Sequence, residues 1–276
     1  PRQPGWRRHL QAVALILALT FLVVALARPA REEKVPRERA TVVLAIDTSL
    51  SMEATDVEPD RIRAAQAAAK EFLDVVPEKI NVGLVSFNGA AQVLVPPTTD
   101  RLAVANAIDS LELAERTAIG EAIFTSLDAV KLAPKAEDED EAVPARIVLL
   151  SDGETTVGRP NVLAAREAAR QEVPVSTIAF GTPDGIIEIT DPATGETSIQ
   201  PVAVDAAALA EIADITGGTA FEADTSEDLR EVYDDIGSSV GFVIEFREIM
   251  AWFVGVALLF LFASSLMSLA WFSRLP

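Results

Sequence analysis

Cysteine is absent from this 276-residue chain, and histidine occurs only once. Without cysteine the protein has no disulfide bond, no thiol nucleophile and no thiolate metal ligand. The one histidine, His9, lies just before a long apolar run, where we expect it at a membrane interface. The middle of the chain therefore has no histidine for a Ser-His-Asp triad or a histidine-based zinc site. Metal ligands there must come from oxygen atoms.

Basic residues are scarce relative to acidic ones. The chain has 23 Lys and Arg against 42 Asp and Glu, a formal net charge of −19 at pH 7. Nucleic acid binding needs concentrated Lys and Arg, so we expect no nucleic acid partner. No Gly-x-x-x-x-Gly-Lys-Ser/Thr run is present either, which argues against a nucleotide-binding loop. An acidic surface suits a divalent cation or a basic partner better.

Two long uncharged apolar runs lie near the two ends of the chain. The first extends from Leu10 to Ala27, about 27 Å as a helix, which is just enough to cross a bilayer. The second extends from Ile249 to Phe272, with Trp252 and Trp271 near its ends as interfacial anchors. We therefore expect a multi-pass protein of the plasma (inner) membrane, in contact with the lipid bilayer. A cleaved signal peptide is the alternative for the first run, since Ala25-Leu26-Ala27 has cleavage-site spacing.

The charges beside the first run indicate an orientation. Arg2, Arg7 and Arg8 precede the run without any acid, whereas residues 28–39 mix Arg and Lys with Glu. The numbers of Lys and Arg alone do not separate the two sides of the run. We place the amino terminus and Arg274 inside the cell and the acidic middle of the chain outside.

Between the two runs, the sequence alternates between strand and helix patterns, which predicts a parallel sheet. The predicted fold class is α/β, a Rossmann-like, doubly wound, mostly parallel six-stranded sheet with one short antiparallel edge strand. Asn88-Gly89 is a hairpin signal that makes the strand after it the antiparallel edge. Residues 185–201 hold two short alternating segments, which we expect to form an inserted hairpin.

The predicted strands cover residues 41–47, 80–87, 91–95, 146–151, 174–180 and 219–222. The predicted helices cover residues 60–76, 100–112, 119–132, 160–171, 205–215 and 226–238. The predicted domain plan is a juxtamembrane segment at 1–9, a transmembrane helix at 10–27, a linker at 28–40, the α/β domain at 41–238, a linker at 239–248, a transmembrane helix at 249–272 and a tail at 273–276.

Three separate segments supply oxygen-bearing side chains for one divalent-metal site. Asp47, Ser49 and Ser51 follow the first predicted strand at i, i+2 and i+4, so a loop winding into a helix can turn their oxygens toward one point. Asp152 ends the fourth predicted strand on the same rim of the sheet, where open α/β sheets place their ligands. Thr117, from a loop between two helices, supplies a fifth oxygen. Mg²⁺ is the expected cofactor, with Mn²⁺ or Ca²⁺ as alternatives.

The charge of this ligand set predicts how a partner binds. Only two of the five ligands are charged, so a bound Mg²⁺ is not over-neutralised by the protein and keeps water in its remaining positions. We expect an Asp or Glu of a partner protein to replace one of these waters. Asp, Ser and Thr after strands are also common caps and turn formers, which is the alternative for each residue alone. Four nearby acids are expected at helix starts or in solvent rather than as ligands, namely Asp56, Asp60, Glu121 and Glu154.

The pattern Asp-x-Ser-x-Ser, followed by a Thr and then an Asp, resembles the metal-ion-dependent adhesion site of von Willebrand factor A (vWA) domains. The similarity extends from about Thr41 to Ile236, and no ligand position departs from the motif. It includes the segments Thr117–Ile123, Ile147–Glu154, Val175–Thr182 and Ile215–Phe221. With two flanking membrane helices, the layout resembles the bacterial Bat-type (aerotolerance-related) membrane proteins.

This resemblance implies a vWA fold and a protein-binding module that holds Mg²⁺. It also implies association with a MoxR-type AAA+ ATPase and with other vWA membrane proteins, in a chaperone-like or envelope-maintenance assembly. One rival is a Mg²⁺-dependent phosphohydrolase of the haloacid-dehalogenase type, but that chemistry needs a second acid two residues after the nucleophile, where this chain has Ser49. A second rival is a structural envelope protein with a silent metal site. We expect no enzymatic activity.

Overall fold

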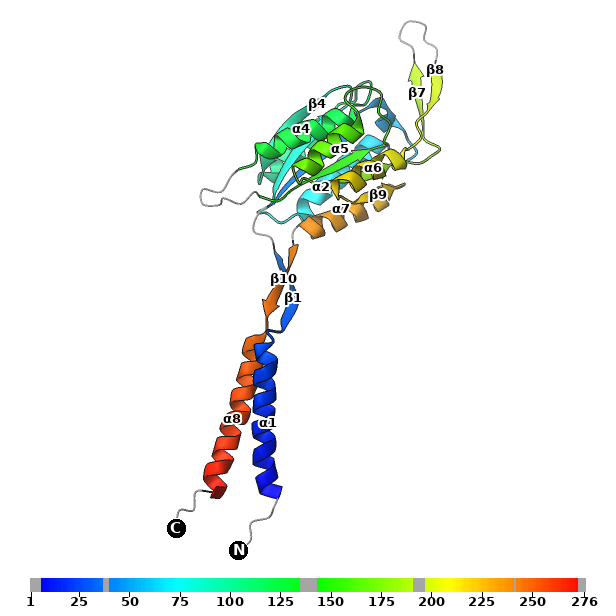
Figure 1. Cartoon of the computed structure of the whole chain (residues 1–276). Coiled ribbons are helices and arrows are strands. Elements are labelled where there is room, and N and C mark those ends of the chain that lie inside the picture. Colours follow the sequence, from blue (N-terminus) through cyan, green and yellow to red (C-terminus); the bar gives the residue numbers. More distant parts are fainter. Residues whose placement is uncertain (1–5, 37–39, 135–142, 191–196, 241, 273–276) are drawn as a thin grey trace. The chain divides into compact units, whose positions relative to one another are not determined.

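The computed structural model describes residues 6–36, 40–134, 143–190, 197–240 and 242–272 (Figure 1). Its contacts divide the chain into two compact units. One unit combines the two ends of the chain, Pro1–Val35 and Val243–Pro276, and the other is Pro36–Phe242.

The Pro36–Phe242 unit is built on a six-stranded sheet. Its strand order is β4-β3-β2-β5-β6-β9, in which all neighbours are parallel except β4, which pairs antiparallel with β3 at one edge. The predicted fold class is therefore confirmed for this unit, although the antiparallel edge strand is longer than expected. The strands are β2 (Thr41–Asp47), β3 (Asn81–Phe87), β4 (Ala91–Thr98), β5 (Ala145–Ser151), β6 (Val175–Phe180) and β9 (Ala220–Ala223).

Helices cover both faces of this sheet, and each face has its own hydrophobic core. Val42, Leu44 and Ile46 of β2 pack with α2, α3 and α7, whereas Val43 and Ala45 pack with α4, α5 and α6. Successive side chains of a strand point to opposite faces, so the apolar run of β2 is explained by burial on both sides. The helices are α2 (Arg61–Val75), α3 (Arg101–Asp109), α4 (Ile119–Lys131), α5 (Asn161–Arg170), α6 (Ala206–Thr216) and α7 (Ser226–Val240).

The inserted hairpin is also present. Strands β7 (Ile186–Thr190) and β8 (Thr197–Pro201) pair antiparallel, with Glu188 opposite Ile199. The hairpin follows the carboxyl end of β6, so it leaves the sheet at the rim where the parallel strands end. Its turn, residues 191–196, lies outside the described residues.

The other unit contains two helices and two short strands. Helices α1 (Trp6–Leu26) and α8 (Met250–Phe272) pack together, and the Phe21 ring stacks on Phe260 with 5.9 Å between centroids. The two segments predicted as linkers, residues 28–40 and 239–248, contain regular structure. Those segments contain β1 (Ala30–Pro36) and β10 (Phe242–Glu248), which pair with each other. The β-branched and aromatic residues of β10 favour a strand, but a lone segment gives no sign of its partner about 200 residues away.

Only one helix in the described part of the chain is long and apolar enough to cross a membrane, namely α8 over Met250–Leu269. In α1 the apolar stretch is shorter, Ala12–Leu26, because polar and basic residues occupy its first turns. The second predicted span therefore fits α8, and the first stays a prediction.

Candidate metal centre

Asp47 lies at the last position of β2, in the middle of the sheet. From β2 the chain first continues to β3 on one side and later returns to β5 on the other side. The helix that follows β2 (α2) and the helix that follows β5 (α5) pack on opposite faces of the sheet. Such a switch point opens a crevice at the carboxyl ends of the strands. Asp47 is fully buried there, and its two carboxylate oxygens accept hydrogen bonds from the Ser49 N–H (2.8 Å) and from the Ser151 hydroxyl (2.6 Å).

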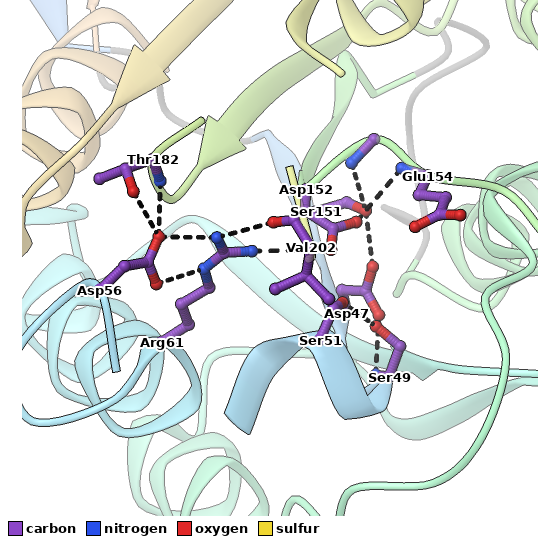
Figure 2. A network of polar contacts seen from close by, with 11 residues as sticks. Asp47, Ser49, Ser51, Asp56, Arg61, Ser151, Asp152, Glu154, Thr182 and Val202 are labelled. Carbon is purple, nitrogen blue, oxygen red and sulfur yellow. Dashed lines mark hydrogen bonds and ion pairs between the residues drawn. The ribbon is translucent and has the colours of Figure 1, made fainter. Parts of the chain in front are cut away.

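Ser49 and Ser51 hold their hydroxyls beside Asp47 (Figure 2). The two hydroxyl oxygens are 2.9 Å apart, and either can be the donor. Ser49 precedes the short 3-10 helix η1 (Leu50–Glu53), yet its side chain makes no capping hydrogen bond. Its hydroxyl is therefore directed to Ser51 and not to the helix backbone. The carboxylate of Asp47, by contrast, does form a local turn through the Ser49 N–H, as short polar side chains often do.

Asp152 follows β5 and faces the same crevice. One of its carboxylate oxygens, Oδ1, accepts from the Glu154 N–H at 3.2 Å. The other, Oδ2, is buried without a hydrogen-bond partner among the described residues and lies 3.7 Å from the Arg61 guanidinium. The carbonyl of Asp152 accepts from the Asp205 N–H at 2.7 Å, which closes the backbone around the site.

Thr117 is buried in the loop before α4, and this loop is tied to both other segments of the site. The Thr117 N–H donates to the Thr156 hydroxyl at 2.9 Å, and the Thr117 carbonyl accepts from the Thr156 and Val157 N–H groups. On the other side, the Ala114 N–H donates to the Thr48 carbonyl at 2.9 Å. In the part of the chain that the structure describes, no hydrogen bond joins the Thr117 hydroxyl to the other four proposed ligands.

The two carboxylates of the site disfavour each other's negative charge. Burial and the negative charge of Asp152 raise the pKa of Asp47 from 3.8 to about 7, although hydrogen bonds from Ser151 and Ser49 oppose this rise. Burial also raises the pKa of Asp152, against the nearby Ser51 hydroxyl, the hydrogen bond from the Glu154 N–H and the positive charge of Arg61. A divalent cation is the kind of ligand that relieves both effects, because it replaces lost hydration and neutralises the pair.

Arg61, a residue that the sequence did not reveal as part of the site, lies fully buried next to Asp152. Figure 2 shows its guanidinium between Asp56 and Asp152. It donates two hydrogen bonds to Asp56 (2.8 and 2.7 Å) and one to the Val202 carbonyl (3.1 Å). The pKa of Asp56 falls to about 2, because hydrogen bonds from Arg61 and Thr182 outweigh the effect of burial.

This network corrects one prediction about the nearby acids. Asp60 does cap α2, accepting from the Arg63 N–H at 2.8 Å, but Asp56 is a partner of Arg61 and not a helix-entry residue. Two glycines leave the space that the buried Arg61 guanidinium occupies, and they are its trace in the sequence. A Cβ at Gly181 or Gly185 would come within 2.3 or 2.1 Å of Arg61 atoms. The signal is recognisable only once the fold brings these segments together.

The donor set fits a hard cation of the Mg²⁺ type. The described residues hold no group of three or more His, Cys, Asp or Glu that could bind a metal, so two carboxylates and neighbouring hydroxyls are the ligands available at this rim. With Asp56 neutralised by Arg61, the two charges of a Mg²⁺ ion would balance those of Asp47 and Asp152. The Oδ2 atom of Asp152, buried without a hydrogen-bond partner among the described residues, is a ligand atom of the kind such an ion uses.

Comparison with known proteins agrees with this geometry. Residues 42–154 match the von Willebrand factor type A domain. The whole chain is 45% identical, over 283 residues, to a UPF0353 protein of Mycobacterium sp. (strain KMS), and covers 83% of it. Among solved structures, it is similar to the conserved hypothetical protein BatB from Bacteroides thetaiotaomicron, with 26% identity and a TM-score of 0.62 over 73% of this chain and 98% of that one.

A second solved structure, an aerotolerance-related membrane protein from Bacteroides fragilis NCTC 9343, has 25% identity and a TM-score of 0.60 over 72% of this chain and 99% of that one. The predicted resemblance to vWA domains and Bat-type proteins is thus confirmed.

Proposed function

This chain belongs to the UPF0353 family and contains a von Willebrand factor type A domain, and from that premise we propose that it is a membrane-anchored protein-binding module. Its metal-ion-dependent adhesion site holds Mg²⁺ through Asp47, Ser49, Ser51, Thr117 and Asp152. An acidic side chain of a partner protein completes the coordination of the ion. Mn²⁺ and Ca²⁺ are the alternative ions.

One observation carries this proposal. Two carboxylates, Asp47 and Asp152, are buried at the same crevice of the sheet, with two serine hydroxyls beside Asp47 and with one oxygen of Asp152 lacking a hydrogen bond among the described residues. Burying two like charges together is costly unless they have a counter-ion. Arg61 lies near one of them but is already held by Asp56, so a divalent cation is the counter-ion that fits.

The ion supplies positive charge at the rim of the sheet, and the chain supplies the geometry around it. Ser49 and Ser51 offer neutral oxygens, so the two carboxylates balance the charge of the ion without exceeding it, and an incoming carboxylate can replace a bound water. The fixed backbone of the three loops keeps these oxygens in place before the partner arrives. Binding then requires both the ion and the partner's acid.

We propose no catalytic activity at this site. A phosphohydrolase of the haloacid-dehalogenase type would need an acid two residues after Asp47, and Ser49 occupies that position with its hydroxyl on Ser51. Among the described residues, neither carboxylate of the site contacts a histidine or lysine that could act as a general base. Nothing observed favours a structural protein with a silent site over a binding module.

We place α8, and α1 as a second span, in the plasma (inner) membrane, with the vWA domain outside the cell. Support comes from the apolar length of α8 and from similarity to an aerotolerance-related membrane protein. The resemblance to Bat-type proteins further suggests work with a MoxR-type AAA+ ATPase and other vWA membrane proteins, in envelope maintenance or chaperone-like assembly.

Isothermal titration calorimetry with Mg²⁺ tests the metal site. The wild-type chain in detergent should bind one ion, and Asp47→Ala should abolish the binding without unfolding the domain. Asp214→Ala, the same change at an exposed position on α6, is the matched control and should bind like the wild type. Unchanged Mg²⁺ affinity in Asp47→Ala would refute the assignment.

A further inference from the structure

The β7–β8 hairpin rises from the same rim as the candidate metal centre. It is inserted after β6, whose carboxyl end lies beside that of β5, the strand that Asp152 follows. On its inner face, Ile187 is buried against Ala54, with Val202 in the same cluster and Leu50 of η1 packed on it. The loop that holds Ser49 and Ser51 therefore continues directly into the support of the hairpin.

Both ends of the insertion are fixed to residues of the site. At its start, the Thr182 N–H and hydroxyl donate to Asp56 at 2.7 and 2.9 Å. At its end, the Val202 carbonyl accepts from Arg61, and the Asp205 N–H donates to the carbonyl of Asp152. These bonds fix the base of the hairpin relative to the metal ligands. A partner that binds the hairpin is therefore held at a defined distance from the ion.

A groove lies between η1 and the hairpin. It has a volume of about 320 Å³ and is lined by Glu53, Thr55, Ile186, Ile187 and Glu188. That is about ten times the volume of one water molecule in the liquid, enough for one long side chain and part of its neighbour. No cation is paired with Glu53 or Glu188 among the contacts of the described residues, and both are exposed.

The outward face of the hairpin adds apolar surface beside this groove. Paired residues of antiparallel strands point to the same face, so Ile186, Glu188, Ile199 and Pro201 share one side. Ile186 and Ile199 are 49% and 63% exposed, unlike Ile187 on the inner face. On this face the exposed Ile186 and Ile199 therefore lie next to the Glu188 carboxylate.

We propose that this groove, which we call the η1–β7 groove, binds a Lys or Arg side chain and an adjacent apolar residue of the partner segment whose acid reaches the metal. The inference rests on the proposed function and names the chemistry of its partner. A Lys or Arg has an apolar stem for Ile186 and Ile187 and a charged end for Glu53 and Glu188.

Charge complementarity favours this occupant over others. The chain has a net charge of −19, so a wholly acidic segment is repelled by the protein even if one of its acids suits the ion. A segment that pairs one acid with one base offers a carboxylate to the ion and a positive charge to the two glutamates of the groove. Like-charge repulsion then acts against other acidic segments, which gives specificity.

Chain lengths set the spacing between the two contacts. Glu53 is two positions after Ser51 in the chain, which puts their Cα atoms at most about 7 Å apart. An extended peptide advances about 3.3 Å per residue, so the partner's acid and base should lie about two to four residues apart.

The test selects peptides from a random 12-residue phage-displayed library on the full chain in lipid nanodiscs with Mg²⁺. Selected peptides should carry an Asp or Glu, with a Lys or Arg and an apolar residue within about four positions. Synthetic copies are then measured by fluorescence anisotropy against wild type, Asp47→Ala, the double variant Glu53→Gln/Glu188→Gln, and the control Glu211→Gln/Glu231→Gln. The control removes the same charge from exposed positions on α6 and α7.

We expect Asp47→Ala to abolish binding, the groove variant to weaken it about fivefold, and the control to change it less than twofold, as for two exposed ion pairs. Two results would refute the role proposed for the groove and leave the proposed function standing. In the first, the selected peptides need Mg²⁺ and an acid but lack a basic residue. In the second, the peptides bind the groove variant and the control variant equally. Failure to select any peptide would also overturn the groove. Equal binding with Mg²⁺ and with chelator would overturn the proposed function itself.

Discussion

Removing the metal should make the vWA domain less stable as pH rises. The pKa of Asp47 is raised in the folded state, so the folded protein favours the protonated carboxyl more than the unfolded chain does. Such a group contributes stability that is fully present below its unfolded pKa of 3.8 and is lost as pH rises through its folded pKa of about 7. Asp152, whose pKa is also raised, acts in the same direction.

The expected size follows from the pKa difference. From 3.8 to about 7 is about 3 pH units, and each unit corresponds to about 1.4 kcal/mol, so the metal-free domain should lose about 4 kcal/mol of unfolding free energy between pH 4 and pH 8. Asp56 does not contribute in this window, because its pKa is lowered to about 2 and its effect appears only in stronger acid. Mg²⁺ at 100 times its dissociation constant should restore about 2.7 kcal/mol at pH 8.

The assay is urea unfolding of the Pro36–Phe242 unit, which contains both hydrophobic cores. The unit has no tryptophan, so unfolding is followed by far-UV circular dichroism at pH 4, 6 and 8, with Mg²⁺ or with chelator. Asp47→Asn is the control, because it keeps the shape of the side chain and removes its ionisation. If wild type and Asp47→Asn lose stability in parallel in chelator, the strained carboxylate pair does not exist and the reasoning fails.

Three further predictions concern neighbouring features. Thr117→Ala should weaken the association with an acidic peptide in Mg²⁺ while leaving the urea midpoint unchanged, and a midpoint drop as large as the affinity loss would contradict a ligand role. Arg61→Met should destabilise the domain by about 3–5 kcal/mol in urea, because it leaves the buried Asp152 and the half-buried Asp56 without their positive neighbour, and Arg61→Met/Asp56→Asn should recover part of that loss. In the cysteine-free chain, Ser238→Cys should react with a membrane-impermeant maleimide in intact cells and Ser273→Cys should not; the reverse pattern would invert the proposed orientation.

The centre of the sheet was predictable because its central strands are buried on both faces. The β2 segment has no charged residue before Asp47, so the apolar run and its end are both visible in the sequence. The same holds for the run from Ile147 in β5 to Asp152. The loops that follow these strands were therefore placed on one rim from the sequence alone, and the structure brings Asp47, Ser49 and Ser51 into direct contact.

The parts that were missed depend on partners distant in sequence. Arg61 appears in the sequence as an ordinary first residue of an exposed helix, and only folding brings Val202 and Asp152 to it. Asp56 was misread for the same reason, because its role is set by Arg61 and Thr182 and not by its own neighbours. Strands β1 and β10 are rich in charged residues, and neither shows in its own sequence that the other end of the chain returns to pair with it.

The pairing of β1 with β10 has a mechanical consequence. The chain enters the Pro36–Phe242 unit from one of these strands and leaves it into the other, so the unit is a closed loop held at its base by a two-stranded ribbon. A force applied through a partner at the metal rim is shared by two adjacent covalent connections. A force that separates the two chain ends instead loads the contacts between α1 and α8 and then the ribbon, before it loads the sheet. The ribbon therefore lies between such a force and the sheet of the vWA domain.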